Sequence, residues 1–200
     1  MTANESAPKL EAPGAGLPPL QGFFAKHVVF PVFCGYHSWN RSELLYKQES
    51  DLILNYCVHL HPEDITKPIL IDRIMGIEDS SRYWSVSMTL EHLMIVGEAV
   101  RTTIISLSKG YAPEFVADTA AVKPEGKYGH EVIELFRGFV DDYVWKIQEK
   151  VNDRDSKTTF KHPWFGPLTA YQWVVMGAMH QRIHRRQIER ICAKLDSYHQ

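Results

Sequence analysis

The sequence predicts an all-α protein built as a four-helix bundle. Four segments place their apolar residues at helical spacing, whereas no run of alternating β-branched residues indicates a strand. The chain has 200 residues, of which 44% are hydrophobic and 23% charged, and this is the composition of a folded globular protein. Because this length suits one domain, we expect the four helices to share one core.

The first twenty residues are expected to lie outside that core. They hold four of the chain's eleven prolines, together with Ala, Gly and Ser, which is the composition of a tail. We therefore divide the chain into a flexible N-terminal tail, 1–20, and a single bundle domain, 21–200.

Composition also indicates the cellular compartment of the protein and excludes some classes of binding partner. The chain carries 22 Lys and Arg against 24 Asp and Glu, so it lacks the basic excess of a nucleic-acid-binding protein. Three scattered cysteines without a C-x-x-C pair indicate reduced thiols. The N-terminus has no signal-peptide pattern, and no apolar run is long enough to span a bilayer. We expect a cytoplasmic protein that binds neither nucleic acid nor membrane.

The first helix is expected over roughly 40–59. Its apolar stripe consists of Leu45, Leu52 and Tyr56. Gln48 and Glu49 lie close to this stripe on the helical wheel. They either line the mouth of a pocket as a ligand-binding pair or are solvated residues at the flank of the stripe.

The other three helices are expected at about 85–108, 130–151 and 170–196. Ser85 suits the N-cap of the second helix, and Gly110 lies where a helix commonly ends on a left-handed glycine. The last helix opens with a capping box made by Thr169 and Gln172. The segment between the third and fourth helices, 153–166, is expected to be a loop.

Three histidines are placed to face one another inside this bundle. His180 and His184 lie one turn apart at the centre of the apolar face of the fourth helix, so their Cβ atoms are about 6 Å apart. His92 lies at the centre of the inward face of the second helix. Two imidazoles at this spacing can reach one metal ion.

A buried histidine is more often a neutral core residue with a hydrogen-bond partner. Three imidazoles in one apolar core, however, each cost roughly 1–3 kcal/mol if unpaired, and a single ion satisfies all three. His₃ with an open fourth position is the arrangement of a catalytic ion. Gln187, on the same face, is either a partner of a ligating histidine or a residue at the edge of the core.

Three stretches resemble motifs of the DinB/YfiT-like superfamily, and together the likeness spans roughly 40–195. They are Trp84-Ser85 with Glu91-His92-Leu93, then His162-Pro163-Trp164-Phe165-Gly166, and last His180-x-x-x-His184-x-x-Gln187-Ile188. The resemblance implies a four-helix bundle with an unusual connection, and a divalent nickel or zinc ion held by His92, His180 and His184. It also implies a small-molecule substrate such as a low-molecular-weight thiol, since characterised relatives include thiol-dependent S-transferases. Arg186 stands where the family often has Gly.

The leading functional hypothesis is a metal-dependent enzyme with thiol S-transferase-like or hydrolase-like chemistry. No Walker A, G-x-S-x-G, G-x-G-x-x-G or H-E-x-x-H motif occurs. No Glu precedes a His by three residues, so the di-iron signature of ferritin-like bundles is also missing. The alternative is a non-catalytic helical-bundle dimer with a structural or vestigial metal site.

The N-terminal extension of the bundle predicts a homodimer. Five large apolar residues fall within 23–30, outside the four bundle helices. They pack either on their own bundle or on a partner chain, and exposed apolar surface of this kind tends to mark an interface. Two-fold pairing is the commonest arrangement of such an interface.

Overall fold

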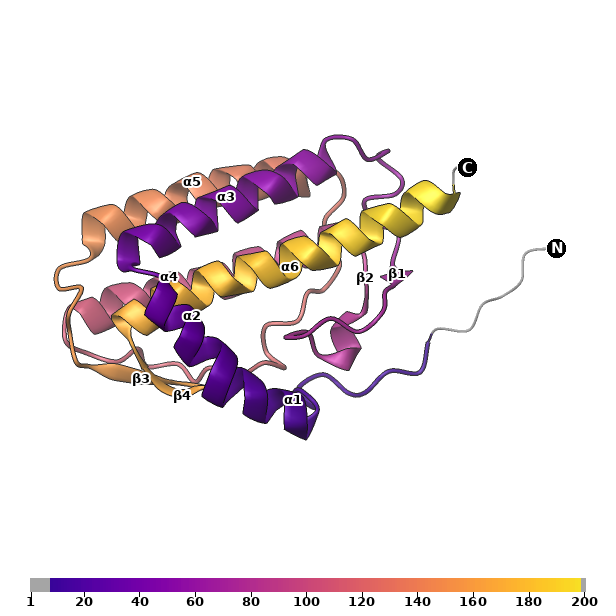
Figure 1. Ribbon diagram of the computed structural model, residues 1–200. Coiled ribbons are helices and arrows are strands. Elements are labelled where there is room, and N and C mark those ends of the chain that lie inside the picture. Colours follow the sequence, from indigo (N-terminus) through magenta and orange to yellow (C-terminus); the bar gives the residue numbers. More distant parts are fainter. Residues whose placement is uncertain (1–7, 199–200) are drawn as a thin grey trace.

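The computed structural model describes residues 8–198, and within this range four long helices form the bundle (Figure 1). They are α3 (Trp39–Cys57), α4 (Val86–Ser108), α5 (Val132–Lys150) and α6 (Ala170–Tyr198). Helix α6 packs against α3 and α4, while α5 packs against α4 and α3. The fold is therefore predominantly helical and resembles a four-helix bundle, as the sequence predicted.

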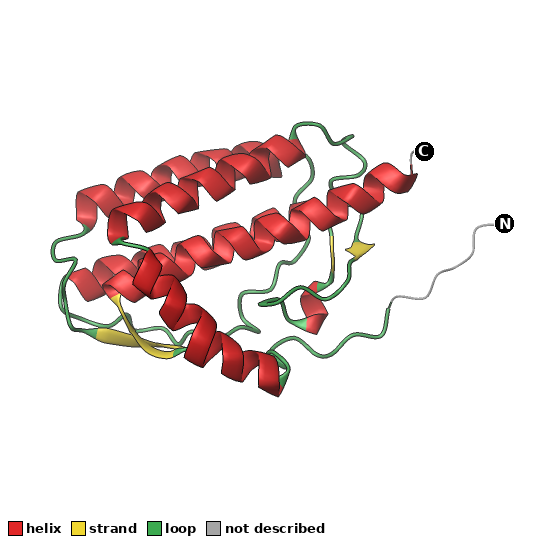
Figure 2. Cartoon of the chain, in the orientation of Figure 1, coloured by secondary structure: helices red, strands yellow, loops and turns green. Residues whose placement is uncertain are grey.

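A strictly all-α class is not confirmed, because two small antiparallel sheets accompany the helices (Figure 2). Strand β1 (Ile69–Leu70) pairs with β2 (Tyr83–Trp84), and β3 (Thr159–His162) pairs with β4 (Gly166–Thr169). The β3–β4 hairpin occupies the segment that was expected to be a loop. Strands of two to four residues are too short to show a periodic pattern in the sequence.

The helix ends follow the predicted capping chemistry. The Ser85 hydroxyl accepts from the backbone N–H of Met88 at the start of α4. Thr169 and Gln172 form the expected capping box, with each side-chain oxygen accepting from the other residue's backbone N–H. Gly110 follows α4 with φ of +87°, a left-handed conformation that glycine adopts without steric cost.

The buried face of α3 differs from the predicted stripe. Leu45 is buried, but Leu52 is 44% exposed. The buried residues of this helix are Trp39, Ser42, Leu45, Tyr46, Glu49, Ser50, Ile53, Leu54 and Cys57. This face is broader than a single stripe because α3 packs against both α6 and α5. Three apolar residues were too few to fix its direction.

The N-terminal segment forms two short helices joined by one π-helical turn. These are α1 (Pro19–Phe24), the turn Ala25–Val29 and α2 (Phe30–Tyr36). Before α1, the backbone N–H of Glu11 donates to the carboxylate of Asp79, and that of Gly14 donates to the carboxylate of Glu78. Residues 1–7 of the expected tail lie outside the described residues, and its flexibility stays a prediction. Within 8–198, no helix has both the length and the apolar content needed to cross a membrane.

Candidate metal centre

Three histidines from two helices meet inside the bundle. One ring nitrogen from each histidine lies within 4.8 Å of the other two, and the Nε2 atoms of His92 and His180 are 3.3 Å apart. His92 comes from α4, whereas His180 and His184 lie one turn apart on α6. The spacing seen in the sequence thus brings all three side chains together at the contact between α4 and α6.

Hydrogen bonds fix the tautomer of two of these rings. His92 Nδ1 lies 2.7 Å from the carbonyl oxygen of Val122, and His184 Nδ1 lies 2.6 Å from the amide oxygen of Gln187. Both partners can only accept, so each Nδ1 carries the proton and each neutral ring keeps a lone pair on Nε2. The amide of Gln187 is oriented in turn, because its Nε2 donates to the carbonyl oxygen of Ser81 at 2.7 Å.

Burial keeps the three rings neutral near pH 7. It lowers the pKa of His92 to about 4, and it lowers the pKa values of His180 and His184 well below the ordinary histidine range. The neighbouring histidines disfavour protonation of His180 and His184 further. Neutral imidazole is the form that binds a metal ion.

One of the three nitrogen–nitrogen separations fits a divalent ion in a tetrahedral site. At metal–nitrogen distances of about 2.0–2.1 Å, two imidazole nitrogens of a tetrahedron lie about 3.3–3.4 Å apart. The separation between His92 and His180 has this value. Within residues 8–198, this donor set contains three imidazoles and neither a carboxylate nor a thiol. The three histidines could therefore hold one ion and leave a fourth position for another ligand.

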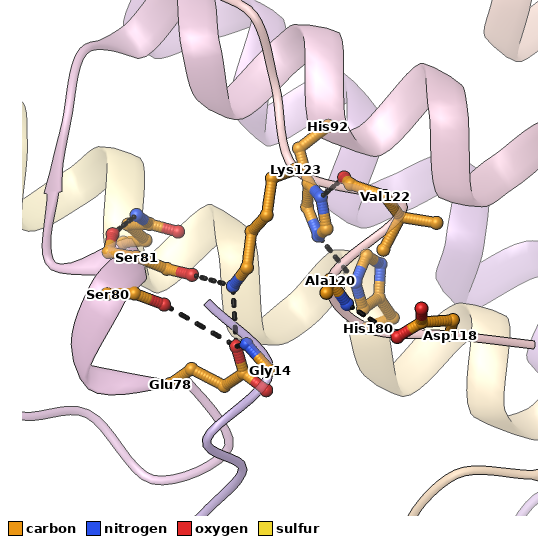
Figure 3. A network of polar contacts seen from close by, with 11 residues as sticks. Gly14, Glu78, Ser80, Ser81, His92, Asp118, Ala120, Val122, Lys123 and His180 are labelled. Atoms are coloured by element: carbon orange, nitrogen blue, oxygen red, sulfur yellow. Dashed lines mark hydrogen bonds and ion pairs between the residues drawn. The ribbon is translucent and has the colours of Figure 1, made fainter. Parts of the chain in front are cut away.

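A cavity of about 300 Å³ opens beside the three histidines. Its walls come from α4, from α6, from the segment between α4 and α5, and from residues 76–81 and 162–164, and most of the residues that line it are apolar. Figure 3 shows the polar contacts at this site, where Lys123 reaches toward Glu78 and Ser81.

Lys123 is a cavity residue that the sequence did not reveal. Its ammonium group lies 2.6 Å from Glu78 Oε2, donates to Ser81 Oγ at 2.9 Å and stands over the ring of Trp84. The contact with Lys123 is a main reason why the pKa of Glu78 lies below its usual range despite burial. The segment that carries Lys123 has no periodic pattern, so its path over the site left no signal in the sequence.

Two of the pocket candidates lie elsewhere. Gln48 is exposed, while Glu49 is buried and accepts from Arg182 Nε at 2.7 Å and from Arg185 Nε at 2.6 Å. Neither side chain lines the cavity. The broad buried face of α3 includes Glu49, which therefore joins α3 to α6 and does not open onto a pocket.

His162, the last residue of β3, also lines the cavity. Its Nδ1 accepts from the backbone N–H groups of Trp164 and Phe165, and its ring stacks on Phe165. Burial lowers the pKa of His162 to about 4.

These depressed pKa values predict a loss of stability in acid. Between pH 6.5 and about pH 4, unfolding lets His92 and His162 take up protons that they do not bind in the fold. Above pH 6.5 both histidines are neutral in the folded and the unfolded chain, so they do not lower the free energy of unfolding. As the pH falls from 6.5 toward 4, protonation favours the unfolded chain and the free energy of unfolding decreases. Urea denaturation of EDTA-treated protein should show lower stability at pH 5 than at pH 7.5, with a smaller difference for His162→Phe. Equal stability at both pH values would contradict the assignment.

Comparison with known proteins shows the fold alone. No family model matches the chain, and no curated protein matches it. The chain is similar to a crystal structure of TT2238, described as a four-helix bundle protein, with 18% sequence identity and a TM-score of 0.52. The match covers 76% of this chain and 98% of that one.

Proposed function

We propose that this protein is a metal-dependent enzyme of the DinB type, in which His92, His180 and His184 hold a divalent nickel or zinc ion. The observation that carries the proposal is the convergence of three neutral imidazoles, with 3.3 Å between the Nε2 atoms of His92 and His180. A cavity beside them gives a small molecule access to the site.

The order of the motifs on the fold supports the family assignment. The stretch around His92 lies on α4, the His180–Ile188 stretch lies on α6, and His162–Gly166 forms the turn of the β3–β4 hairpin that leads into α6. The likeness to another four-helix bundle is compatible with this assignment.

The proposed reaction is transfer to or from the sulfur of a low-molecular-weight thiol, or hydrolysis. A divalent ion in such a site supplies Lewis acidity, which makes a thiol or a water nucleophilic near neutral pH. Val122 and Gln187 orient the ring nitrogens of His92 and His184, which is the usual role of residues behind metal-ligating histidines. The mostly apolar walls of the cavity offer few hydrogen-bond partners to water beside the reacting groups.

Alkylation of butane-1-thiol by an alkyl iodide tests this function. Zinc-loaded protein should consume the thiol faster than EDTA-treated protein, and His184→Ala should remove the difference. If the zinc-loaded protein instead hydrolyses a simple ester, and His184→Ala does not, the protein is a hydrolase. Equal rates with and without zinc in both assays would contradict the proposal.

We also propose that the protein is a homodimer that pairs through α1 and α2. Six apolar side chains spaced along this segment are between 40% and 82% exposed. They are Leu20, Phe23, Phe24, Val28, Val32 and Tyr36. Phe30 is different, because it is buried in its own bundle and stacks on Phe165. Part of the apolar segment therefore belongs to the monomer's core, and the exposed part supports an interface.

A charge on this surface should separate the dimer. Phe23 is 61% exposed, so Phe23→Glu removes apolar contact area without disturbing the core. Light scattering should give a dimeric mass for the unaltered chain and a monomeric mass for the variant. Leu44→Glu is the matched control, since Leu44 is 56% exposed on α3, and it should stay dimeric. A monomeric mass for the unaltered chain would refute the dimer.

A further inference from the structure

We propose that the cavity binds a small amphiphilic anion, with its apolar body against α4 and the 111–131 segment and its anionic head at the three histidines. This inference rests on the proposed function and specifies its substrate class.

The walls of the cavity select an apolar body. Helix α4 contributes Val96, Ala99 and Val100, and the 111–131 segment opposite contributes Phe115, Val116 and Ala117. Such a surface offers a ligand dispersion contacts and removal of apolar area from water, but few hydrogen bonds. A sugar or a peptide backbone would lose its hydrogen bonds to water there without replacement. With a volume of about 300 Å³, the cavity is also at the small end of ligand pockets.

The charges around the histidines select an anionic head. His92 and His184 donate to neutral acceptors, the carbonyl of Val122 and the amide of Gln187, and not to carboxylates. A divalent ion held by three neutral imidazoles would keep both of its positive charges. A buried charge of this size favours an oppositely charged ligand.

The charged residues that line the cavity do not supply that counter-charge. Glu78 Oε2 pairs with Lys123 at 2.6 Å and also accepts from the backbone N–H of Gly14, while Glu78 Oε1 is buried without a hydrogen-bond partner among residues 8–198. Asp118 is exposed, and its carboxylate accepts from the backbone N–H of Ala120. Lys123 forms an ion pair with Glu78, so these two cavity residues together add no net charge beside the three histidines. The ligand must therefore bring the negative charge itself.

Calorimetric titration of the full zinc-loaded chain with straight-chain carboxylates tests the proposal. Zinc stoichiometry is measured first. From butanoate to octanoate, affinity should then rise about fourfold per methylene, the factor that corresponds to roughly 0.8 kcal/mol per buried CH₂. Hexan-1-ol, with a matched body and no charge, should bind about tenfold more weakly than hexanoate. Hexane-1-thiol is titrated as a second ligand. If hexane-1-thiol binds more tightly than hexanoate, the anionic head of the natural ligand is a thiolate rather than a carboxylate.

Variants locate the binding site. Ala99→Phe fills the cavity and should weaken hexanoate binding about tenfold or more while zinc stoichiometry is unchanged. Val116→Asp is the second variant, because Val116 is 85% exposed and its replacement does not disturb the core. It should weaken hexanoate binding more than hexan-1-ol binding.

The outcomes separate this proposal from the proposed function. Stoichiometric zinc with affinity independent of chain length, or with hydrophilic lactate binding as tightly as hexanoate, would overturn the substrate class and leave the metal site standing. Failure to bind zinc would overturn the proposed function, and the anionic head with it.

Discussion

Replacement of His92, His180 or His184 by Ala is expected to abolish stoichiometric metal binding. Each variant leaves two imidazoles, which rarely hold a divalent ion against a competing buffer, so the three losses should be equally complete. Inductively coupled plasma mass spectrometry on each variant after dialysis against zinc measures the effect. Circular dichroism shows whether the variant is still helical.

His59→Ala and His162→Ala are the controls for this experiment. His59 is exposed, and His162 lines the cavity without joining the three-histidine group. Both variants should retain about one equivalent of zinc. Retention of the ion by His92→Ala, together with its loss from His162→Ala, would show that the ligand set is wrong.

The second large effect is expected at Glu49, where one buried carboxylate joins α3 to α6. Glu49→Ala leaves Arg182 and Arg185 without their main partner, although Arg185 keeps its contact with Glu189. Removing one member of a largely buried ion pair should lower the free energy of unfolding by about 2–4 kcal/mol. This loss is smaller than for a fully buried pair, because solvent partly screens the two partly exposed arginines. Urea denaturation measures the change.

The neighbouring Gln48→Ala is the matched control for Glu49→Ala. Gln48 is exposed on the same helix, so its replacement should change stability by no more than about 0.5 kcal/mol. Similar effects of the two substitutions would contradict the view that Glu49 joins the two helices.

Local chemistry explains which parts of the fold could be predicted. A cap such as Ser85 or the Thr169–Gln172 box acts within four residues, so the sequence alone shows where the helix starts. The long helices likewise show their apolar period directly. His180 and His184 are adjacent on one helix face, and His92 needed only the assumption that inward faces share a core.

The features that the sequence analysis predicted wrongly or missed depend on contacts between distant segments of the chain. The buried face of α3 is set by two helices far along the chain, so Leu52 was placed inside, and Glu49 was expected at a pocket mouth or on a solvated flank but is buried. Lys123 reaches the site through an irregular segment whose anchor, Glu78, is 45 residues away. The β3–β4 hairpin is too short to have a period. None of these features has a local signature.

Metal analysis of the full chain, produced without an affinity tag and purified without a nickel column, tests the central claim most directly. The three-histidine site predicts about one equivalent of a divalent transition metal per chain, and a lower melting temperature after chelation. Less than about a tenth of an equivalent, with melting unchanged by chelation, would contradict it and favour the non-catalytic bundle.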